Sequence, residues 1–420
     1  MPARPLRLAM FGPICATGAS SAKSLFDVVH EWVKAGHQID FFSLGTWIDP
    51  AWLVDYPNFR YTPVPLPDWM QLNRFQRSTG PTIPRLVLNA GLSHTTRIAH
   101  ERLLAAAVRR EHATRNYDAF VMINRTCSYP LDDLLPVVSW SQAPPGTESD
   151  FIVREPALSK KELGLSGWAF LRGGYVWRDA AGAAALRRAG GIIASSYWAK
   201  SFFERHGVTS DRLRVLPFPV NVDRFRPAPR PATRDRFAFL WLGRIVPRKR
   251  LPLALEALDR LRRRRPSARL MIVGGPGYGG IIPRYHLPSF GDGVEALAPI
   301  PQTEVPSLFA RTDVVLQPSE NESFGSSGAE ALASGIPSVL GPTNGTSDVL
   351  ADTAFRFTRY EPEDVAAAME RAMDAVLADP EGVAVRARAT AEKTVALPVV
   401  AAHGVDVVRE FIDRWHAARP

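Results

Sequence analysis

Two carboxylates stand eight residues apart in the segment 318–337. Glu322 precedes an expected helix and Glu330 lies inside it, while Ser326 and Ser327 stand at the helix start. The first N–H groups of a helix have no partner within the helix and can bind an anion. Carboxylates accept hydrogen bonds from hydroxyl groups. The segment therefore predicts an anion cradle beside acceptors for the hydroxyls of a sugar or a ribose. The alternative is a strand-to-helix junction whose polar groups only cap the helix.

A basic loop follows the strand expected at 237–242. Arg244 and Lys249 stand five residues apart there, where the chain must turn into the next helix. A guanidinium fork and an ammonium point charge together suit a diphosphate. A solvated basic loop is the alternative. The loop follows a strand end in the same half of the chain as Glu322 and Glu330, and this favours the functional interpretation.

Short apolar runs alternate with helical patterns along the chain, which is typical of parallel sheets in α/β proteins. Strands are expected at 6–11, 39–44, 117–123, 136–140, 190–195, 214–217, 237–242, 269–273, 296–300, 313–317 and 337–340. Helices are expected at 24–33, 197–205, 252–265, 304–310, 328–334 and 399–418. Residues 50–95 are rich in proline and aromatic residues and show no order that we can assign. They are either a substrate-facing insertion or a long surface excursion.

A cluster of prolines between residues 217 and 231 separates two such series. A length of 420 residues also fits two domains. We expect a first Rossmann-like domain over 1–217, a linker over 218–234 and a second Rossmann-like domain over 235–398. A last helix over 399–420 would cross back to the first domain. Ligands of parallel sheets bind beyond the carboxyl ends of the strands, so the cleft between the two domains is the expected site.

The composition excludes several classes of protein. Hydrophobic residues make up 46% and charged residues 22%, as in globular domains and unlike disordered or collagen-like chains. The chain has no run of about 18 apolar residues, so no membrane-spanning helix is expected. Cys15 and Cys127 are too few for a disulfide framework or a four-cysteine zinc site and fit a reducing compartment. The apolar run after Arg7 is too short for a signal peptide, so we expect a cytoplasmic protein.

The charge favours anionic partners. Lys and Arg number 51 against 42 Asp and Glu, a net charge of +9, which suits phosphorylated small molecules, a membrane surface or nucleic acid. The basic run 260–265 has no interleaved aromatic residues, so nucleic acid is not an expected partner and a solvated helix end explains the run better. The nine histidines are scattered without metal-ligand spacing, and no metal site is expected.

Together these motifs resemble those of the retaining glycosyltransferases of family 4, also called group 1. The resemblance rests on G-R-x4-K at 243–249, on P-S-x2-E-x-F-G-x4-E-A-x-A-x-G-x-P at 318–337, and on a strand ending in V-G-G at 273–275. Weaker likeness lies in 215–227 and in Ser195–Trp198. The resemblance covers roughly the whole chain and is strongest over 190–350.

The resemblance implies the GT-B fold, in which the first domain binds an acceptor and the second a nucleoside diphosphate sugar, with no metal or other cofactor. Arg244 and Lys249 would neutralise the diphosphate. Glu322 would hold sugar hydroxyls, and Glu330 would accept the ribose hydroxyls. Further donor contacts would come from Phe324, Gly325, Ser326, Gly12, Gly18, Gln142 and Gly274. The family has no settled protein nucleophile, and none is expected here.

Two positions depart from the family pattern. Ser323 replaces a glycine, which is a small change. Gln142 stands where the first domain often carries a histidine that contacts the donor sugar, and glutamine can hydrogen-bond but cannot titrate. Two alternatives to a glycosyltransferase therefore stay open: a nucleotide- or sugar-binding relative without turnover, and a basic membrane-associated anion-binding protein. The acceptor could be a sugar, a lipid-linked molecule at the inner membrane surface or another small molecule.

Overall fold

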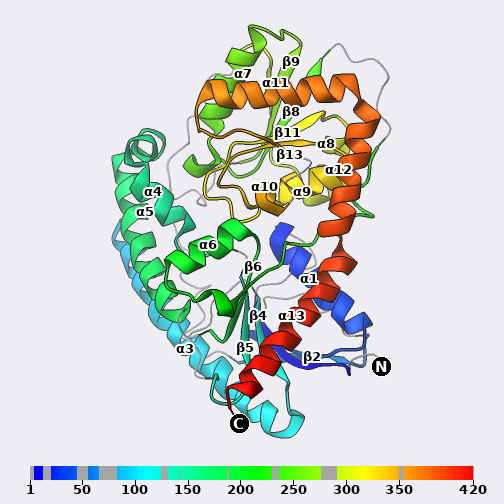
Figure 1. Ribbon diagram of the computed structural model, residues 1–420. Helices are drawn as coiled ribbons and strands as arrows, with labels where there is room; N and C mark the ends of the chain where they lie inside the picture. The colour runs from blue at the N-terminus through cyan, green and yellow to red at the C-terminus, as the bar shows by residue number, and fades with distance from the viewer. Residues whose placement is uncertain are drawn as a thin grey trace.

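A computed structural model describes ten stretches of the chain. They are residues 4–12, 20–44, 55–65, 83–123, 131–141, 143–186, 189–228, 236–275, 291–349 and 354–419. The described residues form two domains, each built on a parallel sheet, one above the other in Figure 1. The expected α/β class with two Rossmann-like domains is confirmed.

The first sheet has seven strands in the order β3-β2-β1-β4-β5-β6-β7, all paired in parallel. Its strands are β1 (Arg7–Phe11), β2 (Gln38–Leu44), β3 (Phe59–Val64), β4 (Ala119–Ile123), β5 (Val137–Ser141), β6 (Gly191–Ala194) and β7 (Leu213–Val215). Strand β4 reads as a continuous apolar run because helices cover both faces of the sheet, and every residue of β4 and β5 is buried. Strand β3 falls in the stretch that sequence periodicity left without order.

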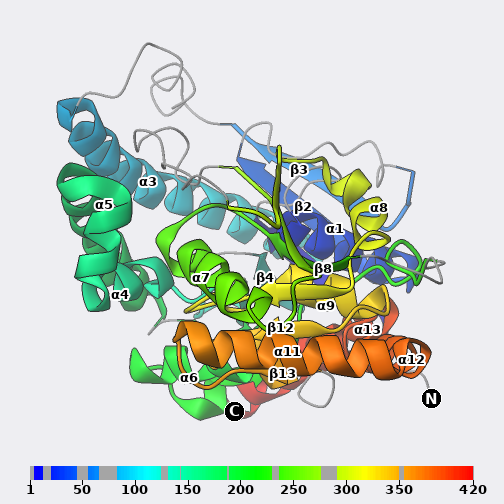
Figure 2. The same ribbon diagram turned by 90° about the horizontal axis from the view of Figure 1, so that it is seen from above.

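The helices of the first domain are α1 (Ser20–Lys34), α3 (Ile83–Arg115), α4 (Thr147–Arg154), α5 (Pro156–Leu186) and α6 (Tyr197–Arg205). Helices α3 and α5 run side by side along one flank of the domain in both views (Figures 1 and 2). Sequence patterning missed α3, α4 and α5. Helix α5 also contains Gly164 in a left-handed conformation (φ 70°), which interrupts its helical geometry.

The second sheet has six parallel strands in the order β10-β9-β8-β11-β12-β13. Its strands are β8 (Phe237–Leu242), β9 (Ala268–Val273), β10 (Val294–Leu297), β11 (Val314–Gln317), β12 (Ser338–Leu340) and β13 (Ala354–Arg356). Its helices are α7 (Leu251–Arg262), α8 (Val305–Phe309), α9 (Ser326–Ala333), α10 (Gly345–Val349), α11 (Pro362–Ala378) and α12 (Pro380–Thr394). Helices α7 and α11 pack together on one face of the sheet (Figure 2). Strand β13 and helices α10 to α12 are absent from the sequence prediction.

The last helix, α13 (Leu397–Ala417), leaves the second domain and lies along the first (Figure 1). The indole N–H of Trp32 in α1 donates to the carbonyl of Ala401 at 2.7 Å. Gly404 permits this close approach, since a Cβ there would stand 3.0 Å from Trp32 and 3.1 Å from Trp140. The helix therefore fastens the second domain to the core of the first. Among the described residues, no helix combines the length and the hydropathy that a bilayer crossing requires.

A substitution of Phe411 tests whether α13 stabilises the first domain. Its side chain is 5% exposed and lies against Gly191 at the start of β6. Phe411→Ala should lower the free energy of unfolding of the first domain by about 3–5 kcal/mol, because a buried aromatic ring is lost and a cavity remains. Urea unfolding followed by fluorescence measures the change. The control is Val385→Ala in α12, where the side chain is 67% exposed, and an equal effect of the two substitutions would contradict the packing.

Candidate functional site

The segment 318–325 links β11 to α9, and Gly325 sets its geometry. Gly325 is left-handed (φ 83°) at the start of α9. A Cβ at this position would stand 2.9 Å from side-chain oxygens of Asn344, Gln317 and Thr346. Only glycine fits both the dihedral angle and the space. The turn directs Glu322, just before it, toward the loop that follows β8.

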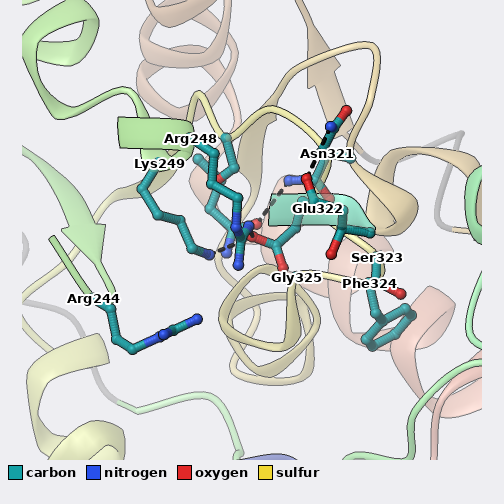
Figure 3. A network of polar contacts seen from close by, with 12 residues as sticks. Arg244, Arg248, Lys249, Asn321, Glu322, Ser323, Phe324 and Gly325 are labelled. Carbon is teal, nitrogen blue, oxygen red and sulfur yellow. Dashed lines mark hydrogen bonds and ion pairs between the residues drawn. The ribbon is translucent and has the colours of Figure 1, made fainter. Parts of the chain in front are cut away.

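Glu322 is held by two cations of that loop. Its Oε2 accepts a hydrogen bond from Arg248 Nη1 at 3.1 Å and another from the ammonium of Lys249. The side chains of Arg248, Lys249 and Glu322 are 10%, 13% and 12% exposed. Figure 3 shows both cations pointing at the Glu322 carboxylate. The two motifs that the sequence predicted separately therefore meet as one buried ion cluster.

Burial alone would raise the pKa of Glu322, but Lys249 and Arg248 lower it to about 2. Burial, with the neighbouring cations Arg248 and Arg244, lowers the pKa of Lys249, while Glu322 opposes that change. A carboxylate facing two cations at close range favours the charged form. Glu322 is therefore ionised and able to accept hydrogen bonds from hydroxyls at neutral pH.

Arg244 lies at the edge of this cluster and does not contact Glu322. Its side chain is 59% exposed, and Figure 3 shows it well away from Glu322. Arg244 instead pairs with Glu148 of the first domain, whose Oε1 lies 3.7 Å from Arg244 Nη2. An exposed guanidinium beside a buried cation pair can move to meet an anionic ligand.

Glu330 has a different environment from Glu322. It lies in α9 and is 6% exposed, and its Oε1 accepts a hydrogen bond from Gln302 Nε2 at 2.9 Å. Burial raises its pKa to about 8, although Gln302 and Arg224 act in the opposite direction. The carboxyl group is therefore protonated through most of the neutral range until a ligand or a cation stabilises its charge.

The other expected site residues are placed as follows. Phe324 is buried, with its ring centroid 5.7 Å from that of Phe218, and Ser326 opens α9. Gly274 follows β9 at a point where a Cβ would stand 1.9 Å from the Gly243 carbonyl oxygen. Gly12 follows β1, where a Cβ would stand 2.2 Å from the carbonyl oxygen of a neighbouring strand. Gly18 and Gln142 lie outside the described residues.

Contacts from the first domain complete the site, and sequence reasoning missed most of them. The hydroxyls of Ser195 and Ser196 donate to the carbonyl of Ser323 at 3.1 and 2.7 Å. The Trp198 amide donates to Asp348 Oδ2 at 2.8 Å. The only sequence signal was the likeness of 195–198 to a family segment. Helix α4 also contacts the segment 318–325, and no motif in the sequence predicted this contact.

Two arginines of the basic run 260–265 form ion pairs within the second domain. Arg264 bonds Glu363 and Glu370 at 3.0 Å each, and Arg265 bonds Glu370 at 3.1 Å and Asp374 at 2.6 Å. These carboxylates belong to α11. Half-exposed pairs of this kind weaken the case for the run as a surface for nucleic acid or anionic lipid. In the described parts of the chain, no three His, Cys, Asp or Glu side chains gather as metal ligands would.

Comparisons with known proteins point to the same region. Residues 224–392 match the family described as Glycosyl transferases group 1. The D-inositol 3-phosphate glycosyltransferase 2 of Catenulispora acidiphila is 31% identical over 153 residues, which cover 34% of this chain and 36% of that protein. The chain thus spans about a third of the length of the curated relatives that it matches. These matches support a group 1 glycosyltransferase assignment for the second domain.

Two solved structures share the fold along nearly the whole chain. The E. coli structure described as trehalose-6-phosphate bound with UDP-2-fluoro glucose is 13% identical, with a TM-score of 0.64 over 96% of this chain and 99% of that one. Anabaena HepE in complex with UDP and glucose is 15% identical, with a TM-score of 0.55 over 96% and 99%. Likeness at this identity concerns the fold, and the expected GT-B arrangement is confirmed.

Glu330 makes the stability of the protein depend on pH. Its pKa is 4.5 when unperturbed and about 8 in the folded chain. Between these values the folded state binds the extra proton, so stability falls as pH rises, by at most about 1.4 kcal/mol for each pH unit. Glu330→Gln keeps the acceptor for Gln302 and removes the titration. The variant should therefore gain stability over wild type from pH 5 to pH 8. Thermal unfolding at both values measures this, and a constant difference would contradict the burial of a titrating group.

Proposed function

We propose that this chain is a glycosyltransferase that moves a sugar from a nucleoside diphosphate sugar to an acceptor. The observation that carries the proposal is the cluster of Glu322, Arg248 and Lys249, with Arg244 exposed beside it. The cluster lies within the residues that match the group 1 family. It places cations for a diphosphate next to an ionised acceptor for sugar hydroxyls.

Arg244 and Lys249 serve the leaving group in this proposal. The bond between the anomeric carbon and the diphosphate oxygen breaks, and negative charge accumulates on the departing diphosphate. Fixed cations in a site with little water stabilise that charge, and the loss of one such group costs about 10²–10³ in rate. Arg244 has the freedom to close on the diphosphate, whereas Lys249 is already fixed against Glu322.

The two carboxylates orient the donor. Glu322, ionised and held by two cations, accepts hydrogen bonds from the sugar hydroxyls. Glu330 accepts the ribose hydroxyls of the nucleotide, which requires its carboxyl to lose the proton or to rotate its carbonyl oxygen toward the ribose. The new bond forms between the anomeric carbon and an acceptor oxygen, and the acceptor proton leaves with the diphosphate or to water. Transfer with retention of configuration and membership of family 4 form part of the proposal.

The identity of the nucleotide is proposed from the structural neighbours. The E. coli and Anabaena structures are described with UDP-2-fluoro glucose and with UDP and glucose, so UDP is the first nucleotide to test. The first domain is proposed to bind the acceptor. The positive charge needed for the diphosphate comes from side chains, so we propose that turnover needs no metal and persists in EDTA.

Nucleotide binding gives a direct test. UDP at 100 times its dissociation constant should stabilise the protein by about 2.7 kcal/mol, measured as a rise in the unfolding temperature. Arg244→Ala should remove most of that rise, because the exposed guanidinium no longer meets the diphosphate. Arg311→Ala is the matched control, since that arginine is 60% exposed in the same domain and pairs with Glu295.

Two outcomes would redirect the proposal. If UDP, GDP, ADP and dTDP all leave the unfolding temperature unchanged, the diphosphate assignment is wrong. If a nucleotide stabilises the protein but the matching UDP-sugar is neither transferred nor hydrolysed, the chain is a binding relative without turnover.

A further inference from the structure

We infer that Glu148, in the first domain, is a positioning residue for the donor site of the second domain and acts through Arg248. The inference rests on the proposed function, because it assigns Glu148 the task of orienting the sugar-binding carboxylate Glu322. Neither the motif spacing nor the resemblance assigns a role to Glu148 or to Arg248.

Glu148 stands in the first turn of α4, and its side chain is 13% exposed. Its Oε1 accepts a hydrogen bond from Arg248 Nε at 2.6 Å. The same guanidinium donates through Nη1 to Glu322 Oε2 at 3.1 Å. One arginine thus bridges a carboxylate of the first domain and a carboxylate of the second.

The bridge needs an arginine. A guanidinium presents several donors in a rigid fork and can hold two carboxylates at fixed angles, whereas an ammonium is a point charge on a flexible stem. The pairing also balances charge. The carboxylates of Glu148 and Glu322 face two largely buried cations, Arg248 and Lys249. The third cation, Arg244, is exposed. Loss of Glu148 would leave a largely buried cation short of a partner, and breaking such a pair is strongly unfavourable.

Other hydrogen bonds hold α4 against the segment 318–325. Asn321 Nδ2 donates to the Thr147 carbonyl at 3.1 Å and to Asp150 Oδ2 at 2.7 Å. Arg154 Nη1 donates to Glu320 Oε1 at 3.1 Å. Helix α4 therefore hydrogen-bonds to the residues just before Glu322 in the chain. Glu148 of the same helix binds Arg248.

Two residues at this contact have positive φ angles, which are unusual for residues other than glycine. Asn321 has φ 53° and Arg250 has φ 51°, the left-handed region that favours glycine. Such conformations persist where surrounding contacts over-determine them. The Arg250 guanidinium lies 5.2 Å from the ring centroid of Phe151 in α4. The conformation of the loops that carry Lys249 and Glu322 thus depends on contacts from the first domain.

The consequence is that Glu322 takes its observed orientation only while α4 is docked. Opening of the domains would separate Glu148 from Arg248 and release one of the two anchors of Glu322. Donor-sugar positioning would then be coupled to domain closure, as in enzymes whose site is completed by a closing element. Diphosphate binding would depend less on Glu148, because Arg244 and Lys249 belong to the second domain.

The experiment compares Glu148→Gln and Arg248→Lys with wild type in the full chain. The control is Glu31→Gln, which removes a partly exposed carboxylate of the same domain that pairs with Lys34 at 3.0 Å. Hydrogen exchange without ligand reports loop order at the amides of Glu320 and Glu322, which donate to Arg248 O at 2.7 Å and to Thr343 O at 2.9 Å. Calorimetry measures the dissociation constant of UDP, and a turnover assay with the UDP-sugar measures kcat.

In both variants, exchange at these amides should rise by about tenfold or more, as expected when a buried pair is broken. The kcat should fall by about tenfold or more, while the dissociation constant of UDP changes by less than about threefold. Glu31→Gln should match wild type in all three measurements. This split between binding and turnover is one that general destabilisation would not produce.

Several results would overturn the inference. Unchanged exchange in Glu148→Gln would show that Glu148 does not order the loop, and wild-type behaviour of Arg248→Lys would show that charge without the fork suffices. Failure of wild type to bind UDP would count against the proposed function alone, because the exchange measurement uses no ligand. If Glu148→Gln does not fold, Glu148→Gln/Arg248→Met removes both partners. Its exchange should equal that of Arg248→Met, and faster exchange in the double variant than in Arg248→Met would refute the coupling.

Discussion

A carboxylate that is largely removed from water stays charged only where cations lie against it, and Glu322 is such a group. Lys249 and Arg248 meet its Oε2 from the loop after β8, while Glu322 itself follows β11. This contact exists because β8 and β11 are neighbours in the sheet although far apart in sequence. The order β10-β9-β8-β11-β12-β13 changes direction between these two strands. Loops leave an open parallel sheet on opposite sides at such a point, which is where ligands of α/β proteins bind.

The first domain repeats the same arrangement. Its order also changes direction between β1 and β4, and Gly12 follows β1 beside the end of β4. Several contacts between described residues join the two domains, and two of them differ in character. Helix α13 packs against α1 through Trp32 and Gly404, and α4 contacts the segment 318–325 through polar groups. The first contact combines buried ring packing with one hydrogen bond, whereas the second includes an ion pair, so the second is the one that an anionic ligand can alter.

Much of the fold follows from the sequence because buried parallel strands leave a strong pattern. The runs 237–242 and 197–205 match β8 and α6 residue for residue, and the other expected strands differ from the observed ones by a few residues at their ends. Helices α3, α5, α11 and α12 were missed. Helix α3 carries no clear apolar face, and such a segment becomes a helix through packing against its neighbours rather than through its own periodicity.

The sequence by itself determined the residue types of the site and their placement after strands β8 and β11, since motif spacing and strand ends are local properties. The resemblance gave Glu322 and Glu330 different hydroxyls to bind, but nothing in the sequence distinguished their ionisation. Only the tertiary structure separated them, because two cations lower the pKa of the first to about 2 while burial raises that of the second to about 8. The partnership of Glu148 with Arg248 was likewise decided in three dimensions. Charge on a buried group depends on what lies within a few ångströms, and that is fixed by how distant segments pack.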